Sequence, residues 1–450
     1  MPGLSRHGCV ALGLGVGLVA GCPTDQPILP PLPAGDVTGS GVGPTTSVDS
    51  SSGPTSGGPA SGSTTASADS SGSSGEGLAC GLVDGGCTPA AGGWWDTRWP
   101  YRRQLDITSP IGSSLPDAMV PIRLGEDFDP GCAREDGGDL RVVDGEGTER
   151  PHEIDEWGEF GRVLWVHLDA LEPAGETLWL YYGNEGATAP ADEVWPSDTG
   201  PLGLHAVLHF AGDLEEARGA HQGEPAQMGA IPQYVPDGVM GRAIHFERIL
   251  VETRVVLTDS ISIDEAIAMS HAMTLSAWVR TTPDVAAPAP YRTIASRGLA
   301  FWSLTVHDPS LPYDFLDPAY GRFLTALGGG MVDEFENPTE VVTHPLIASW
   351  HHMACVLEEV GGGQYEKSLY VDGVLARDTG PFALDWTALE VGDLPLTLGS
   401  GPENSMQYVH HGEIDEIHVA SEAWSEDRIT AEFEFGDDPS LVTVAAPECQ

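Results

Sequence analysis

The chain has 450 residues, and its 67 Asp and Glu against 20 Lys and Arg give a formal charge of −47 at pH 7. This length is typical of about three domain-sized units. Because a polyanion repels other polyanions, the charge argues against nucleic acid and anionic lipid surfaces as partners.

The first 21 residues predict a signal peptide for export. Arg6 supplies the basic start, and residues 10–20 form an apolar, glycine-rich run that is too short to span a bilayer as a mature helix. The sequence Leu-Val-Ala-Gly-Cys at residues 18–22 resembles a bacterial lipobox, which implies that Cys22 is acylated and anchors the protein. An ordinary signal peptide that contains a cysteine is the alternative. We expect an exported protein, lipid-anchored to the bacterial cell envelope at the outer membrane or cell surface, with no other membrane contact.

Residues 22–93 are rich in Pro, Ser, Gly and Thr. Such a segment has too little apolar surface to offset the entropy of ordering, so we predict a disordered tether. Near its end, Cys80 and Cys87 lie close together between glycines, and in an exported chain this favours a disulfide over a metal pair. The sequence leaves the pairing of Cys132 open, with Cys449 as one option, and it predicts Cys355 to be a buried core thiol.

Residues 94–186 predict a small β domain, because short apolar runs alternate with turn residues. The predicted strands cover residues 119–124, 139–143, 163–168 and 177–182. The sequences at residues 94–103, 138–144, 151–157, 164–166 and 180–184 resemble domain of unknown function 2341, which occurs in exported bacterial proteins. That family has no assigned chemistry, so the resemblance implies a domain and no activity.

A linker is predicted at residues 187–203, followed by a larger β region at residues 204–445. Residues 273–280 alternate cleanly, which places Met273, Leu275, Ala277 and Val279 on one strand face. An Asp-Gly pair at residues 372–373 predicts a tight hairpin turn, and Ser425 before two acids predicts a short helix toward Phe433. Many strands without a long helical period predict a two-sheet sandwich.

Several short sequences in this region resemble the laminin-G-like, concanavalin A-like jelly roll family; they lie at residues 209–210, 241–246, 275–279, 350–353, 369–373, 398–399 and 412–417. The resemblance implies a module that binds sugars, proteins or matrix components, often with calcium. The predicted fold is therefore all-β: a small β domain, then a concanavalin A-like jelly roll β-sandwich, preceded by the disordered tether.

The sequence Gly-Glu-Ile-Asp-Glu-Ile-His-Val at residues 412–419 mixes acids and apolar residues with a period of two. An unbroken strand would place Ile414 with Glu416 on one face and Asp415 with Ile417 on the other. Paired acids of this kind resemble the catalytic centre of laminarinase-type glycoside hydrolases, in which two glutamates act as nucleophile and general acid. Here the second glutamate is replaced by Ile417, which argues against hydrolysis.

Asp415 admits two other interpretations. It binds a calcium ion together with Asp213, whose acidic loop follows the first strand of the same jelly roll, or it is a structural acid that hydrogen-bonds a neighbouring loop. Calcium prefers six to eight oxygen ligands gathered from separate segments. The sequence predicts Asp213 and Asp415 as calcium ligands and leaves the structural alternative open.

The chain lacks a nucleophile elbow, a phosphate-binding loop and a dinucleotide-binding motif in a suitable context. We therefore predict no enzymatic activity, and expect a cell-surface protein that binds a glycan or an envelope or matrix protein through the jelly roll. The alternatives are a polysaccharide hydrolase of concanavalin A-like fold and a structural envelope scaffold.

Overall fold

The computed structural model describes residues 87–90, 92–188, 190, 194–195, 202–225, 232–247, 253–258, 260–282, 291–297, 302–307, 320–325, 348–378, 380–383, 395–401 and 409–450. All of these belong to one compact unit, Ser73–Gln450. The predictions for the signal peptide, Cys22, Cys80 and most of the tether lie outside the described residues. Among the described helices, none is long and apolar enough to cross a membrane.

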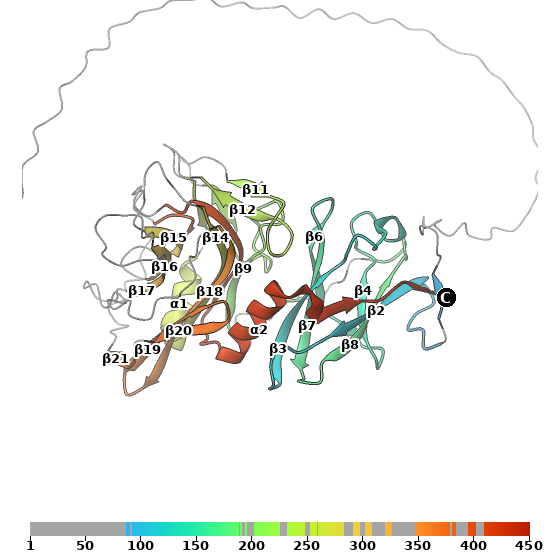
Figure 1. Ribbon diagram of the computed structural model, residues 1–450, viewed down its shortest axis with the longest axis horizontal. Helices are drawn as coiled ribbons and strands as arrows, with labels where there is room; N and C mark the ends of the chain where they lie inside the picture. The colour runs from blue at the N-terminus through green and yellow to red at the C-terminus, as the bar shows by residue number, and fades with distance from the viewer. Residues whose placement is uncertain are drawn as a thin grey trace, which may run out of the picture. The chain divides into compact units, whose positions relative to one another are not determined.

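The first part of this unit is a β-sandwich made of two sheets (Figure 1). Side chains at alternate positions of a strand form its core: Ala118, Val120 and Ile122, all in the strand Leu115–Arg123, are fully buried. One sheet has the order β1 (Thr88–Pro89), β25 (Glu448–Cys449), β2 (Tyr101–Ile107), β8 (Glu176–Tyr182), β4 (Arg141–Asp144), β5 (Glu149–Arg150), with β24 (Val442–Val444) also on β2. The other has the order β3 (Leu115–Arg123), β7 (Arg162–Leu171), β6 (His152–Trp157).

Three predictions about the two ends of the folded unit are wrong. The C-terminal strands β24 and β25 both pair with β2 of the first sandwich, although the sequence assigned residues up to 445 to the jelly roll. Cys87 forms its disulfide with Cys449 and not with Cys80, and Thr88 pairs with Glu448, so the predicted tether stops short of residue 93. Cys132 is itself in a disulfide, which is not with Cys449. Closeness in sequence did not predict the partner of Cys87, because residues 87 and 449 come together only in the folded protein.

The second part is a larger sandwich, also of two sheets (Figure 1). Its six-stranded sheet has the order β10 (Gly223–Pro225), β13 (Val255–Leu257), β22 (Leu396–Leu398), β15 (Tyr291–Ser296), β16 (Trp302–His307), β17 (Tyr320–Thr325). Its nine-stranded sheet has the order β11 (Gln233–Val235), β12 (Ala243–Phe246), β23 (Gly412–Ala420), β14 (Met273–Thr281), β18 (Trp350–Gly361), β19 (Gln364–Val371), β20 (Val374–Asp378), with β9 (Leu204–Leu208) on β23 and β21 (Phe382–Ala383) on β19. The all-β prediction is confirmed.

The core of this second sandwich follows the predicted alternation. Met273, Leu275, Ala277 and Val279 of β14 all lie in it. Cys355 on β18 is free and fully buried, as predicted, and burial raises the pKa of its thiol. The predicted hairpin is also confirmed, because β19 and β20 pair directly around residues 372–373. Helix α1 (Ile261–Ser270) was not predicted.

Helix α2 (Glu426–Asp437) begins at Ser425, whose side chain accepts a hydrogen bond from the Arg428 N–H, as the capping pattern predicts. The helix lies between strands of the two sandwiches (Figure 1). Its Ala431 and Phe435 join the core of the first sandwich, while Trp278 of the second stacks on Phe433. The helix therefore covers the outer face of the nine-stranded sheet and packs it against the first sandwich.

Candidate functional site

Strand β23 departs from regular alternation in its middle. Ser276 pairs with His418 and Trp278 with Asp415, so Ala277 alone lies opposite both Glu416 and Ile417. Glu416 adopts a left-handed backbone with φ of 48°. This is a β-bulge, which turns the strand and redirects its side chains. The predicted face assignment is therefore wrong: Ile414 and Ile417 both enter the core, and Asp415 and Glu416 both point out of it.

The residues that resemble a hydrolase centre differ in their surroundings, since Ile417 lies in the core and Glu413 in a hydrogen-bonded group. Ile417 is fully buried in the core at the position where a second carboxylate is required. Glu413 is bonded through one oxygen to His245, at 2.9 Å, and through the other to Arg280, at 2.9 Å. Burial alone would raise the pKa of Glu413, but these two hydrogen bonds outweigh it and hold the pKa below its usual value.

Asp415 accepts hydrogen bonds from a neighbouring loop, as the structural alternative predicts. Its Oδ2 accepts the backbone N–H groups of Val239 and Met240 at 2.7 and 3.0 Å, and its Oδ1 accepts the Glu416 N–H. Burial raises its pKa to about 7, although these backbone bonds oppose the shift. Asp213 accepts only a local bond from the Glu215 N–H among the bonds described. Calcium binding by this pair stays a prediction.

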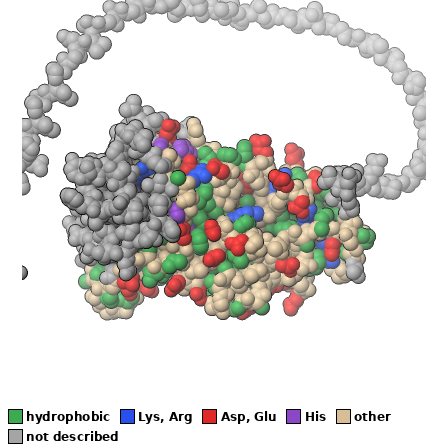
Figure 2. Space-filling model, in the orientation of Figure 1, with side chains coloured by type: hydrophobic (Ala, Val, Ile, Leu, Met, Phe, Trp, Pro, Cys, Tyr) green, Lys and Arg blue, Asp and Glu red, His purple; other side chains and the backbone are tan. Residues whose placement is uncertain are grey.

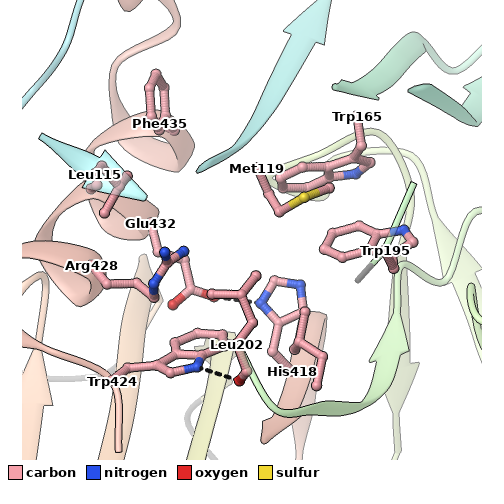
Figure 3. Close-up of a pocket in the computed structure, with 12 residues that line it drawn as sticks. Leu115, Met119, Trp165, Trp195, Leu202, His418, Trp424, Arg428, Glu432 and Phe435 are labelled. Carbon is pink, nitrogen blue, oxygen red and sulfur yellow. Dashed lines mark hydrogen bonds and ion pairs between the residues drawn. The ribbon is translucent and has the colours of Figure 1, made fainter. Parts of the chain in front are cut away.

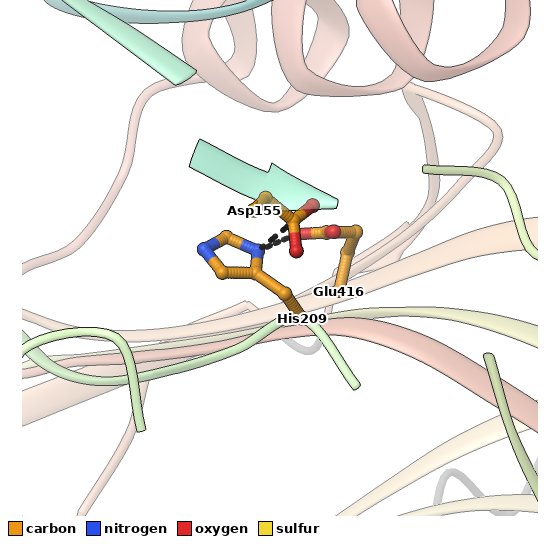
Figure 4. Close-up of side chains that lie close together, drawn as sticks. All are labelled: Asp155, His209 and Glu416. Carbon is orange, nitrogen blue, oxygen red and sulfur yellow. Dashed lines mark hydrogen bonds and ion pairs between the residues drawn. The ribbon is translucent and has the colours of Figure 1, made fainter. Parts of the chain in front are cut away.

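A different group of possible ligands lies where the two sandwiches meet (Figure 4). Asp155 of β6, His209 just after β9 and Glu416 of β23 bring one ligand atom each to within 4.8 Å of the others. His209 Nδ1 lies 2.8 Å from Glu416 Oε2 and 4.0 Å from Asp155 Oδ2. The Asp155 and Glu416 side chains are 1% and 2% exposed. Burial raises the pKa of both acids well above the usual range.

Bulges position both of these acids. On β6 the pairing with β7 shifts between Ile154 and Glu156, which leaves Asp155 as the extra residue. Glu416 occupies the bulge on β23 described above. Bulges commonly re-aim a side chain next to a functional site. Here they turn two carboxylates from different sheets toward one imidazole.

Several polar atoms of this group have no hydrogen-bond partner within the described part of the chain. They are both carboxylate oxygens of Asp155, Oε1 of Glu416 and Nε2 of His209. Most buried polar side-chain atoms do have a partner, and each unpaired one costs about 1–3 kcal/mol. The arrangement is therefore costly as it stands, and it offers free lone pairs at its centre.

One further histidine and two further acids surround the three. His418 Nε2 lies 3.8 Å from Glu416 Oε2 and is itself unpaired in the described region, while its Nδ1 bonds Glu432 Oε1 at 2.5 Å. On the other side, Glu153 Oε2 lies 3.9 Å from His209 Nε2. Each imidazole thus has one nitrogen near Glu416 and its other nitrogen near a second glutamate, Glu153 for His209 and Glu432 for His418.

A small cavity adjoins this cluster (Figure 3). The indole rings of Trp165 and Trp195 lie beside the His418 ring, and Trp424 closes another side. The cavity measures about 40 Å³. That volume accommodates a water molecule or two, whereas ligand pockets usually measure about 300–1,000 Å³.

Comparison with known proteins identifies the second sandwich. Residues 256–430 match the family model described as the concanavalin A-like lectin/glucanases superfamily. These residues form a concanavalin A-like domain. No curated protein matches the chain.

Similarity to solved structures is distant. Domain 4 of AbnA, a GH43 extracellular arabinanase from Geobacillus stearothermophilus in complex with arabinotriose, is 15% identical over 50% of this chain and 96% of that chain, with a TM-score of 0.34. The binding domain of Paraclostridial Mosquitocidal Protein 1 is 13% identical over 51% of this chain and 52% of that chain, with a TM-score of 0.37. A botulinum neurotoxin type C structure, described as dependent on two ganglioside molecules for cell entry, is 14% identical over 52% and 51% of the two chains, with a TM-score of 0.35. These similarities are too weak to assign a ligand.

Sequence reasoning missed the cluster of Asp155, His209 and Glu416. Asp155 and His209 stood within sequences noted for their family resemblance, but no local pattern relates residues so far apart in the chain. The available signal was weak: two adjacent acids, Asp415 and Glu416, in a predicted strand. Only the pairing of β9 with β23, and the packing of β6 against them, brings the three together.

Proposed function

We propose that the chain is an exported, lipid-anchored envelope protein whose concanavalin A-like domain binds a glycan without hydrolysing it. The observation that carries the proposal is the match to a superfamily of lectins and glucanases, combined with Ile417 buried in the core. A glucanase mechanism needs two carboxylates flanking the scissile bond. With Glu413 occupied by His245 and Arg280, the lectin function is favoured.

The charge of the protein narrows the class of glycan. Acidic side chains are scattered over the face shown in Figure 2, with few basic ones between them. The whole chain carries a formal charge of −47. Because like charges repel, we expect a neutral glycan rather than an acidic polysaccharide.

Trp350 is a candidate contact for such a glycan. It begins β18, is partly exposed, and lies under the Arg280 guanidinium at 4.9 Å from the ring centroid. Asp237, which is bonded to Arg280 at 2.7 Å, places a further polar group beside the ring. An apolar ring bordered by donors and acceptors is the usual composition of a small-ligand site.

A glycan array probed with the full chain, with and without calcium, tests this proposal. Trp350→Ala should abolish binding to the glycans that the wild type selects. Trp179→Ala is the matched control, because Trp179 is also partly exposed under a guanidinium, that of Arg102 at 3.9 Å, but belongs to the first sandwich. Absence of any glycan signal for the wild type would contradict the proposal and favour the envelope scaffold, in which the first sandwich, proposed here as related to domain of unknown function 2341, attaches to another protein.

The hydrolase alternative has its own test. We expect no release of reducing ends from β-glucans by the full chain, because no second carboxylate accompanies Glu413 at position 417. Reproducible release that disappears in Glu413→Gln would establish the hydrolase instead.

Calcium binding by Asp213 and Asp415 remains part of the proposal. An ion that binds only the folded state stabilises it by about 2.7 kcal/mol at a hundredfold excess over its dissociation constant. The melting temperature should then rise with calcium and fall with a calcium chelator, and Asp213→Asn should remove the response. Asp213→Asn is the sharper variant, because Asp415→Asn also disturbs the bonds to Val239 and Met240. A melting temperature that does not change with calcium would contradict calcium binding and leave both residues as structural acids.

A further inference from the structure

We infer that Asp155, His209 and Glu416 bind one divalent transition-metal ion of the zinc type, which ties the first sandwich to the concanavalin A-like domain. The inference starts from the free lone pairs at the centre of the group. Both oxygens of Asp155 and one of Glu416 are without hydrogen-bond partners in the described chain, in side chains that are 1% and 2% exposed. Figure 4 shows both carboxylates directed at the His209 ring.

The distances suit a small ion. Zinc binds imidazole nitrogen and carboxylate oxygen at about 2.0–2.2 Å, so neighbouring ligand atoms of a tetrahedral site lie about 3.4 Å apart. The separations from His209 Nδ1, 2.8 Å to Glu416 and 4.0 Å to Asp155, bracket that value. A shift of about 0.6 Å in either carboxylate oxygen would bring it to that separation from Nδ1.

A fourth donor is available from β23 itself. His418 Nε2 has no partner in the described region and lies 3.8 Å from Glu416 Oε2. Its Nδ1 bonds Glu432, which fixes Nε2 as the nitrogen with a free lone pair. Metal-bound histidines are commonly held by a carboxylate in this way. Glu153, 3.9 Å from His209 Nε2, is placed to hold the other imidazole similarly.

The donor set also selects the class of metal. Two carboxylates and imidazoles match zinc and its transition-metal neighbours, whereas calcium takes oxygen ligands. Trp165 and Trp195 wall the histidine side with apolar surface, since their rings lie 5.5 and 5.3 Å from His209. Such a shell limits access of water, which strengthens the attraction between the ion and the carboxylates.

The position of the ligands indicates what the ion does. Asp155 belongs to β6 of the first sandwich, and His209 and Glu416 belong to the second. The ion therefore clamps the two sandwiches together beside the ion pair of Arg242 with Glu156. This role is independent of glycan binding, and its test uses metal ions alone.

The first measurement is metal content and affinity. The full chain, stripped with a chelator and titrated with Zn²⁺ or Co²⁺, should bind one ion, and bound Co²⁺ should give visible ligand-field absorption. Asp155→Asn and Glu416→Gln should each remove the site, and Glu432→Gln should weaken it about 10- to 100-fold through His418. His245→Gln is the matched control, because His245 forms a similar histidine–glutamate pair on the same sheet and should leave binding unchanged.

The second measurement separates loss of metal from loss of fold. In chelator, Asp155→Asn should melt close to the wild type, because the amide keeps the shape of the side chain and carries no charge. With Zn²⁺, only the wild type should gain melting temperature. A wild type that binds neither Zn²⁺ nor Co²⁺ overturns the inference. Binding that survives both Asp155→Asn and Glu416→Gln also overturns it, since the ion would then lie elsewhere.

Discussion

His410 makes the stability of the concanavalin A-like domain depend on pH in a defined window. Its ring is fully buried near Phe246, and neither ring nitrogen has a partner among the described residues. Burial first, and then the Arg292 guanidinium, lower its pKa from 6.5 to about 3, while the backbone and the charge of Glu413 oppose the shift. The charge of His411 lowers it further.

The sign follows from proton counts. Between pH 6.5 and 3 the unfolded chain carries a proton on His410 and the folded chain does not, so acid favours unfolding. The free energy of unfolding is therefore unaffected by His410 above pH 6.5, and it decreases as the pH falls from 6.5 toward 3. Each pH unit in the window changes the free energy of unfolding by about 1.4 kcal/mol, and the whole window by about 5 kcal/mol.

Urea unfolding of the wild type and His410→Gln, in chelator between pH 7.5 and about pH 4, measures this effect. The variant starts from a lower stability, but its free energy of unfolding should fall less steeply with acid, by about 1.4 kcal/mol per unit below pH 6.5. Acids that do not interact with His410 contribute equally to both proteins and cancel in the difference. Parallel curves for the two proteins would refute the reasoning.

Three further predictions concern packing, the disulfide and the anchor. Gly436→Ala should destabilise the protein by about 1–3 kcal/mol in urea, because a Cβ there would lie 2.2 Å from the Trp278 ring; unchanged stability would contradict that contact. Replacing both Cys87 and Cys449 by Ser should cost about 2–5 kcal/mol in the same assay and lower the melting temperature; a melt like that of the wild type would show that the bridge adds nothing. Cys22→Ala should release the protein from membranes on fractionation, and retention would argue against lipidation.

The parts of the fold that the sequence predicted are those fixed by neighbouring residues. Alternation alone places Leu275 and Val279 of β14 in the core, and the Asp-Gly turn depends on backbone freedom at two adjacent positions. Helix α1 was missed although a local signal was present. Ile263 and Ile267 are four residues apart and bury one helical face. That apolar spacing is also compatible with a short buried strand segment.

The parts that the sequence could not provide depend on the partner strand or on the far end of the chain. Two-residue strands such as β1 and β25 carry no pattern of their own, and Cys87 meets Cys449 across 362 positions. The bulge at Glu416 arises from register between β23 and β14, so residues 412–419 alone read as an unbroken strand. For the same reason Ile417 seemed to share a face with Asp415.

The two bulges bear on how the cluster persists in the fold. A regular β23 would direct Glu416 into the apolar core with Ile414, where a charge has no partner. The bulge avoids this, but it holds Glu416 in a left-handed backbone that costs about 1–3 kcal/mol and places it beside Asp155 in a second buried environment. Stability alone would favour an apolar residue at either position. A cation bound between the two acids offsets both costs, because it supplies the opposite charge that the described residues around Asp155 and Glu416 do not provide at their unpaired oxygens.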